Sequence, residues 1–537
     1  MARNVLILLA LVAIVGLPFA LKPKDNLLSQ ADETLVVVTP HIEAIRYEFA
    51  RGFRDWYKAK TGKTARIDWR VVGGTSEIAR YLASSYQAPF ENVWRFKKRM
   101  HLTDLAQRSF DDPKIKLPDD AAKDTEAQMA RRAFLDSDAG IGIDIFFGGG
   151  SFDFVQQAQA GRLVDSGFIR AHPKIFGDGP QRIPRSFSGE PYWDEEGKWM
   201  GSVLSSFGIC YNDDSLKRLA VSTPPQNWTD LGRPEYFGEV AIADPNMSGV
   251  VAKTFEMIVQ QQIAQRLANP ADNPSAAPGI AAGWADGMQL VQRLGANTRY
   301  FTDLSTKMPM DVSDGNAAIG MSIDFYGRFQ AESNKDPRTG RERMHYFNPP
   351  GGTSIGVDPI GLLRGAPHRA LAQAFIEYVM SVDGQKLWDF KVGTPGGPQK
   401  YVLRRSAIRR ELYAPEFAGF RADPTVNPYD EAKDFTYHPE WTAKLFGPLR
   451  FIVRVMCIDP HEEAAEAWQE LIRAKFPPEA TRTFADVSAV SYEEATVRIG
   501  EALKSSDRLT ATRLAATMTS HFRNQYKRAG ELARAGK

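Results

Sequence analysis

Four turns of the chain carry the residue types that bind anions. Each places a hydroxyl group, a glycine N–H or both at the expected start of a helix: Thr39-Pro40-His41, Thr75-Ser76, Gly149-Gly150-Ser151 and Ser248-Gly249. The first amide groups of a helix lack intrahelical partners, and the helix dipole adds partial positive charge there. Any one turn is also compatible with an ordinary helix N-cap. Because four of them recur on one strand-and-helix pattern, the sequence predicts a site for an anionic ligand.

The third turn belongs to the stretch "IDIFFGGGSFDF" at positions 143–154. The stretch begins as a short buried strand, breaks into three glycines and continues as a helix. Three consecutive glycines cost conformational entropy on folding, so they indicate a place where side chains cannot be accommodated. We predict that a ligand approaches the bare backbone at this turn.

The elements that position these turns alternate between apolar strands and amphipathic helices, which is the pattern of an α/β sheet. The first expected elements are a strand at 34–40, a helix at 42–62 that ends at Gly62, a strand at 65–72 and a helix at 73–86. Residues 88–138 have no strong period and are predicted to be an insertion. The alternation returns from residue 207, and from about residue 405 the chain is mainly helical.

Composition excludes several classes of protein. The 537 residues have a net charge of +2, so no bulk positive charge marks the chain for nucleic acid. Apolar residues make up 43% and charged residues 25%, which is typical of a soluble globular protein. Cys210 and Cys457 are the two cysteines, which excludes a disulfide scaffold and an all-cysteine metal site. Whether they form a disulfide in an oxidising compartment stays open.

The N-terminus indicates export. In "MARNVLILLALVAIVGLPFALKPKDN" one early cation, Arg3, precedes an apolar run from Val5 to Leu21. This run is slightly long for a signal peptide and near the lower limit for a membrane span. We therefore expect residues 1–30 to be a cleaved signal peptide or an N-terminal membrane anchor, and the rest to be periplasmic.

The order of several motifs resembles the periplasmic solute-binding proteins of ATP-driven (ABC) importers, in the branch that binds ferric iron and related anions. The stretches that carry this resemblance are "VVVTPHIEA", "IDIFFGGGSFDF", "QAGRL", "GICYNDDSL", "NWTDLGRPEYFGEVAIADPNMSGV" and "GGTSIGVDPIGLLRGAPHRALAQAFIEYVMSVDGQ". Together they cover about residues 34–400 in the family's order. The insertion at 88–138 and everything past about residue 400 lie outside the resemblance.

The resemblance implies the type II periplasmic-binding-protein fold, in which two α/β lobes joined by strands hold the ligand between them. The expected parts are lobe 1 at 31–206, lobe 2 at 207–344, a return to lobe 1 at 345–404 and a helical C-terminal extension at 405–537. Gly208–Tyr211 and Tyr346–Asp358 are expected to form the hinge. The implied function is to capture a small solute and deliver it to an ABC permease in the inner membrane, as a monomer, free or membrane-tethered.

The identity of the solute stays open between three classes. In ferric-binding relatives a histidine, a glutamate and two tyrosines hold the metal, and His41 matches the histidine. Gly149 stands where the glutamate is expected, and Asp324, Phe325 and Tyr326 stand where the tyrosines are expected. At least two anionic oxygens are therefore missing for a hard trivalent cation.

An anionic or phosphorylated solute held by the helix N-termini is the preferred interpretation, and no cofactor is expected. Ferric iron as cargo, held by His41, Asp324 and Tyr326, is the first alternative. A polyamine or another cation attracted by Asp324 and Asp358 is the second.

Two other functions are weighed against transport. "TGKT" at 61–64 lacks the first glycine of a phosphate-binding loop, and no nucleophile elbow or paired-histidine zinc motif occurs, so an enzyme is not expected. A hydrolase or transferase stays an alternative, because fold does not fix function. A ligand-sensing subunit without a transport role is the remaining alternative, which the expected membrane tether and the long helical C-terminus favour.

Overall fold

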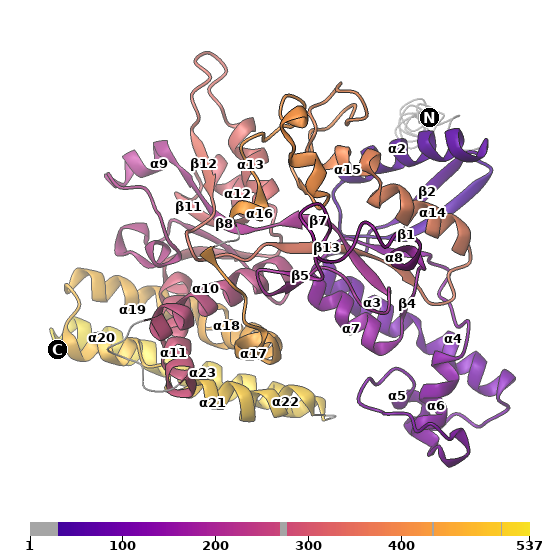
Figure 1. Ribbon diagram of the computed structural model, residues 1–537. Helices are drawn as coiled ribbons and strands as arrows, with labels where there is room; N and C mark the ends of the chain where they lie inside the picture. The colour runs from indigo at the N-terminus through magenta and orange to yellow at the C-terminus, as the bar shows by residue number, and fades with distance from the viewer. Residues whose placement is uncertain (1–30, 269–275, 432–433, 506) are drawn as a thin grey trace, which may run out of the picture.

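Two main sheets, each with its own hydrophobic core, form the two lobes of the molecule (Figure 1). The computed structural model describes residues 31–268, 276–431, 434–505 and 507–537. The predicted signal peptide or anchor at 1–30 lies outside these residues. The predicted class, a two-lobed α/β fold of type II with a helical C-terminal part, is confirmed.

Lobe 1 is built on a sheet of order β14-β7-β13-β3-β1-β2, with β4 paired to β13. Its strands are β1 (Glu33–Val38), β2 (Ala65–Arg70), β3 (Ile145–Phe147), β4 (Leu163–Val164), β7 (Trp199–Ser205), β13 (Gly356–Leu363) and β14 (Ser406–Ala407). β1, β2 and β3 are parallel; most apolar side chains of β1 and all those of β3 are buried, while the edge strand β2 is mostly half-buried. A separate hairpin pairs β5 (Ser186–Phe187) with β6 (Glu190–Pro191).

Helices cover both faces of this sheet (Figure 1). They are α2 (Glu43–Thr61), α3 (Thr75–Ser85), α7 (Ser151–Ala160), α8 (Phe168–Ala171), α14 (Arg369–Met380) and α15 (Val382–Asp389). α2 packs against α14 and α15, and α3 packs against α7. The predicted C-cap of α2 is confirmed, because Gly62 adopts φ 78° in the left-handed region that favours glycine.

The insertion is a small helical unit that projects from lobe 1 (Figure 1). It contains α4 (Gln87–Asn92), η1 (Val93–Lys97), α5 (Asp104–Ser109), η2 (Ala121–Lys123) and α6 (Glu126–Leu135). Its own core includes Phe90, Trp94, Phe110 and Phe134. Its short segments explain why the sequence shows no sustained helical period there.

Lobe 2 is built on a sheet of order β10-β9-β11-β8-β12. Its strands are β8 (Phe207–Asn212), β9 (Val240–Ala243), β10 (Thr298–Thr302), β11 (Ile319–Ile323) and β12 (Met344–Phe347). Its helical segments are α9 (Asp213–Arg218), η3 (Trp228–Gly232), η4 (Pro234–Tyr236), α10 (Gly249–Ala268), α11 (Ala276–Asn297), α12 (Lys307–Ser313) and α13 (Asp324–Ser333).

The chain crosses between the lobes at three places. Ser206 joins β7 to β8, and residues 348–355 join β12 to β13. The expected return at 345 falls inside β12, which pairs with β8, so the chain leaves lobe 2 only at Asn348. The third crossing follows Tyr429, which is still in the core of lobe 1.

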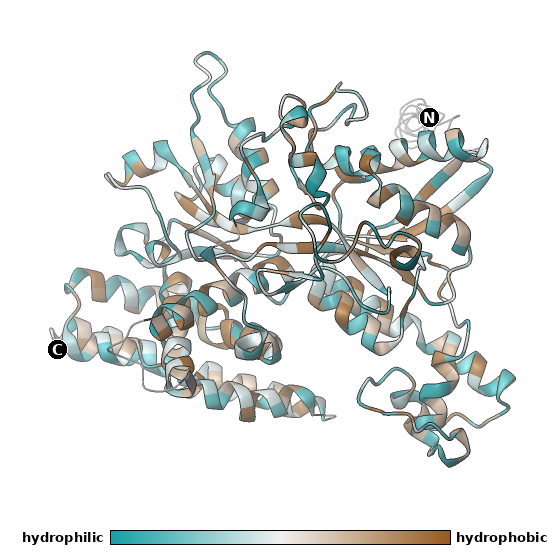
Figure 2. Ribbon diagram, in the orientation of Figure 1, coloured by the Kyte–Doolittle hydropathy of each residue, from teal (hydrophilic) through white to brown (hydrophobic). Residues whose placement is uncertain are grey.

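The C-terminal part divides between the two lobes. Residues 406–407 pair with β7, and η5 (Arg410–Tyr413), η6 (Pro415–Phe417) and α16 (Pro428–Glu431) follow before the third crossing. The remaining segments are α17 (Pro439–Thr442), η8 (Ala443–Leu445), α18 (Phe446–Val453), η9 (Arg454–Ile458), α19 (His461–Arg473), α20 (Pro478–Phe484), η10 (Ser488–Val490), α21 (Tyr492–Glu494), η11 (Ala495–Ile499), α22 (Gly500–Lys504) and α23 (Arg508–Arg534). They share the core of lobe 2, and α23 alternates apolar and polar side chains as a surface helix does (Figure 2).

Both cysteines lie in this larger core and are free. The Cys210 thiol donates to the Gly320 carbonyl, and the Cys457 thiol donates to the Val291 carbonyl. Burial raises the pKa of both thiols, which keeps them neutral and unreactive. Among the described helices, none combines the length and the apolar character that a membrane span requires.

Candidate functional site

A fully buried arginine, Arg405, lies where the two lobes meet. Its Nη2 donates to Asp358 Oδ2 and to Ser205 Oγ, both at 2.6 Å. Its guanidinium carbon lies 4.1 Å from the ring centre of Phe325, which belongs to lobe 2, and 5.3 Å from that of Trp388 in lobe 1. Arg405 therefore joins lobe 1 to lobe 2 through an ion pair and a cation–π contact.

The residues around Arg405 form an inner cluster. Lobe 2 contributes the first turn of α13 to it. Asp324 is buried and pairs with Arg328 at 3.5 Å, while its Oδ1 has no hydrogen-bond partner. Burial raises the pKa of Tyr326 to about 12, although the neighbouring Arg405 opposes that shift. The predicted residues Asp324, Tyr326 and Asp358 are thus gathered around Arg405.

His41 lies in the core of lobe 1 beside this cluster. Its ring contacts the Phe147 ring edge-on, and its Nε2 is 3.4 Å from Arg405 Nη1 and 4.0 Å from Asp358 Oδ2. Burial and the charges of Arg405 and Arg46 hold the pKa of His41 well below its usual range. Among the described residues, no group of three or more His, Cys, Asp or Glu side chains is arranged to hold a metal ion.

An outer cluster brings three helix N-termini together across the lobe interface. A methyl group placed on Gly249, the first residue of α10, would lie 3.6 Å from Asp153 Oδ2, 3.7 Å from Arg450 Nη2 and 4.0 Å from Ser76 Oγ. Asp153 and Ser76 belong to the first turns of α7 and α3 in lobe 1. Ser248 caps α10, because its Oγ accepts from the Val251 amide at 3.4 Å. Three of the four predicted turns therefore converge.

The fourth predicted turn does not join them. α2 begins at Glu43, after Thr39-Pro40-His41, so these residues present no helix N-terminus. Thr39 is fully buried, and its hydroxyl donates to the Phe147 carbonyl at 2.7 Å and accepts from the His41 amide at 3.1 Å. Its hydrogen-bonding capacity is used within lobe 1.

The structure gives an internal reason for two of the three consecutive glycines. Gly148 and Gly149 have φ of 89° and 112°, which side chains rarely adopt. A Cβ atom on Gly148 would lie 2.4 Å from the His41 ring, and one on Gly149 would lie 2.4 Å from Thr75 Cγ2. Only Gly150 faces open space. Packing of His41 and Thr75, rather than a ligand, therefore accounts for the first two glycines.

Replacing Gly148 by alanine is expected to lower the free energy of unfolding by at least about 2 kcal/mol, because strain and overpacking add. The His41 ring cannot move aside, since it is held against Phe147 and Trp388. Gly150→Ala is the matched control, with φ −83° and no atom within 4 Å of the new Cβ, and should cost less than about 1 kcal/mol. Urea denaturation measures both, and equal losses would contradict the packing argument.

Stability should also depend on pH through Asp324. Burial raises the pKa of Asp324 to about 6, although Arg328 and Arg405 oppose the shift. The folded state then holds the proton more tightly than the unfolded chain, so wild type loses stability as pH rises from about 4 through about 6. Relative to Asp324→Asn, which cannot titrate, the wild-type free energy of unfolding should fall by up to about 3 kcal/mol across this window. Parallel pH profiles in urea denaturation would contradict this assignment.

Several residues of the two clusters were not predicted from the sequence, among them the charged residues Asp153, Arg328, Arg405 and Arg450. Arg405 and Arg450 follow the resembling segment. Arg405 reaches the lobe interface because the next residues, 406–407, pair with β7, and Arg450 reaches it after the third crossing between the lobes. No local motif distinguishes them from the chain's other arginines. Spatial information was required to find them.

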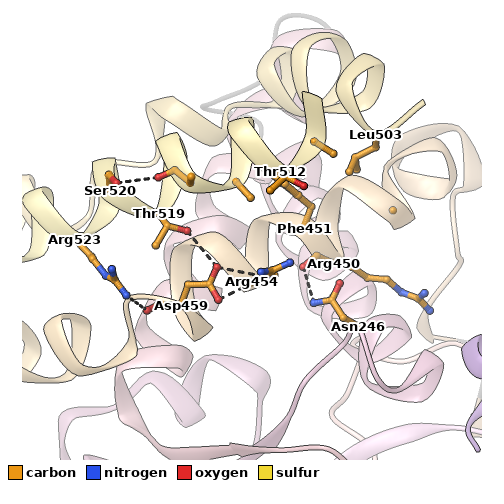
Figure 3. Close-up of a pocket in the computed structure, with 14 residues that line it drawn as sticks. Asn246, Arg450, Phe451, Arg454, Asp459, Leu503, Thr512, Thr519, Ser520 and Arg523 are labelled. Carbon is orange, nitrogen blue, oxygen red and sulfur yellow. Dashed lines mark hydrogen bonds and ion pairs between the residues drawn. The ribbon is translucent and has the colours of Figure 1, made fainter. Parts of the chain in front are cut away.

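A pocket of 840 Å³ lies between α23 and the α18–η9 segment, and Asn246 and Arg450 line its edge toward the lobe interface (Figure 3). Its charged groups largely pair with one another. Arg454 pairs with Asp459 at 3.3 Å, Thr519 donates to Asp459 Oδ2 at 3.2 Å, and Arg523 donates to the Asp459 carbonyl at 2.8 Å. We assign no ligand to this pocket.

Comparison with protein families decides the class of protein. A family model described as bacterial extracellular solute-binding protein matches residues 142–412, half of the chain. The chain belongs to this family. The matched region contains β3, the glycine turn, both sheets' crossing strands and β14, so it includes Arg405, Asp358 and the N-termini of α7 and α10, while α3 and Arg450 lie outside it.

Individual relatives of this solute-binding protein are distant. An uncharacterized protein of Haemophilus influenzae is 26% identical over 247 residues, 45% of this chain and 60% of that protein. The phosphoglycerate transport regulatory protein PgtC of Salmonella typhimurium is 23% identical over 214 residues, 40% of this chain and 46% of that protein. The chain thus spans about half the length of the curated relatives it matches.

The solved structure of the periplasmic binding protein AfuA from Actinobacillus pleuropneumoniae, with exogenous fructose-6-phosphate bound, aligns to the solute-binding protein with a TM-score of 0.47 and 15% identity. The alignment covers 76% of this chain and 94% of that one.

Proposed function

We propose that this solute-binding protein captures a small anionic, phosphorylated solute between its lobes in the periplasm and delivers it to an ABC permease. The observation that carries the proposal is the meeting of the α3, α7 and α10 N-termini across the lobe interface. Each offers backbone N–H groups and a positive dipole end, and together they favour negative charge. Closure of the lobes would bring donors from both sides onto one anionic group.

The charges at the interface support an anion over a cation. Asp358 is paired with Arg405, and Asp324 is paired with Arg328, so each carboxylate already has a counter-ion in the protein. His41 faces the guanidinium of Arg405, which would repel a ferric ion at that position. We therefore place an organic anion ahead of ferric iron or a polyamine as the cargo.

The name of one relative suggests a starting ligand. PgtC is a phosphoglycerate transport regulatory protein. Phosphoglycerate carries a phosphate and a carboxylate, the two oxyanion types that helix N-termini bind. We propose small phosphorylated acids as the first class to screen.

A thermal-shift screen tests the proposed function. The panel consists of 3-phosphoglycerate, inorganic phosphate, ferric citrate and spermidine, each added to purified protein. We expect 3-phosphoglycerate to raise Tm by mass action and to reduce the radius of gyration in solution scattering as the lobes close. Stabilisation by ferric citrate or spermidine alone would contradict the anionic class.

A ligand sensor is the second candidate, because the name of the same relative describes a regulatory protein. The two functions predict different phenotypes in cells but the same affinity for the solute. Deletion should abolish uptake of the bound solute if the protein serves a permease. Normal uptake with a lost transcriptional response would favour the sensor instead.

A further inference from the structure

Arg450 enters the lobe interface from the C-terminal part of the chain. It lies on α18, beyond the residues 142–412 that match the family model, and its carbonyl accepts from Asn246 Nδ2 at 3.3 Å. Its side chain points away from α23 and away from the neighbouring Arg454–Asp459 pair (Figure 3). Its Nη2 instead lies beside the first turn of α10.

The guanidinium of Arg450 lies 4.7 Å from the ring centre of Phe446, but its hydrogen-bonding capacity is not satisfied by the protein. Its Nε and Nη2 are buried and have no hydrogen-bond partner among the described residues. Buried donors without partners are rare and costly, because their hydration is lost without replacement. A guanidinium in this state indicates that an acceptor is missing from its surroundings.

A second unpartnered group lies at the same point. Ser76 is only 4% exposed, and its Oγ has no hydrogen-bond partner. The position of a methyl group on Gly249 is within 4.0 Å of both Ser76 Oγ and Arg450 Nη2, and nothing lies closer than 3.6 Å. Two donors from different lobes, with the N-terminus of the 20-residue helix α10, thus surround one small space.

One acidic group faces the same space. Asp153 Oδ2 lies 3.6 Å from the position of a Gly249 methyl group. Burial raises the pKa of Asp153 to about 6, while Arg450 and Arg80 oppose the shift. Asp153 therefore balances Arg450 without ligand, and its charge should weaken the binding of an anion.

We propose that Arg450 and Ser76 form an oxyanion subsite at the N-terminus of α10 that binds the phosphate group of the captured solute. The C-terminal part of the chain thereby contributes a ligand-binding cation to the solute-binding module. This inference rests on the proposed capture of a phosphorylated solute. Bidentate donation by a guanidinium is the strongest hydrogen bonding that a side chain offers to a phosphate.

Calorimetric titration with 3-phosphoglycerate and with inorganic phosphate tests the subsite. Arg450→Met should weaken the affinity for 3-phosphoglycerate by about 10- to 100-fold, and Arg450→Lys should restore part of it. Arg454→Met is the matched control, because Arg454 lies on the adjoining turn and pairs with Asp459, and should bind as wild type does. Asp153→Asn should strengthen binding, since it removes the opposing charge.

The variants also separate binding from folding. Without ligand, Arg450→Met should melt close to wild type, because Arg450 is only half-buried and its Nε and Nη2 make no hydrogen bond that the substitution would break. Wild-type affinity in Arg450→Met would overturn the subsite and leave the proposed function standing. Failure of wild type to bind either phosphorylated probe would overturn the anionic ligand class and the subsite with it.

Discussion

Replacing Arg405 by methionine is expected to lower the free energy of unfolding by about 3 kcal/mol or more. Arg405 is fully buried, and its removal leaves the Asp358 carboxylate, 16% exposed, without its counter-ion. Breaking one partner of a buried ion pair costs about 3–5 kcal/mol, because the remaining charge is neither hydrated nor paired. The contact with Phe325 is lost in the same step, so the lobes should also separate more easily.

The double variant Arg405→Met, Asp358→Asn is the control for this prediction. It removes both charges, so it should recover a large part of the stability that the single variant loses. Urea denaturation of wild type, both single variants and the double variant gives the coupling energy. Additive losses would show that Arg405 and Asp358 do not act as a pair.

Replacing Ser248 by aspartate is expected to weaken the binding of a phosphorylated solute by about tenfold to thousandfold. Ser248 caps α10 at the lobe interface, so a carboxylate there would occupy the amide groups and oppose the charge of the ligand. The fold should tolerate the change, because aspartate is itself a good N-cap. Calorimetric titration with 3-phosphoglycerate measures the loss.

Ser222→Asp provides the matched control for charge. It introduces the same carboxylate at an exposed position of the same lobe, between α9 and η3. Its affinity should equal that of wild type, and both aspartate variants should melt close to wild type without ligand. Normal binding by Ser248→Asp would show that the α10 N-terminus is not part of the ligand site.

The fold was largely predictable because its determinants are local. The apolar run of β1, the left-handed cap at Gly62 and the glycine turn before α7 each follow from residues within a few positions. The placement of the C-terminal part was harder to predict from the sequence. Residues 405–431 remain on lobe 1 because Ser406 and Ala407 pair with β7, some 200 residues earlier in the chain, and no local pattern reports such a pairing.

The site was predictable only in part, for the same reason. Ser76, Ser248 and Gly249 were found because a helix N-terminus has a sequence signature. Thr39 carries the same signature, but its hydroxyl bonds the Phe147 carbonyl 108 residues away. Arg405 and Arg450 act through neighbours that are distant in the sequence, so their roles appear only in three dimensions.

Native mass spectrometry of the protein purified without added ligand tests the central claim, capture of an anionic solute between the lobes, most directly. We predict a retained organic acid whose mass fits a phosphorylated compound, absent from Ser248→Asp prepared in the same way. Retention of iron or of a polyamine, at equal occupancy in wild type and Ser248→Asp, would contradict the account.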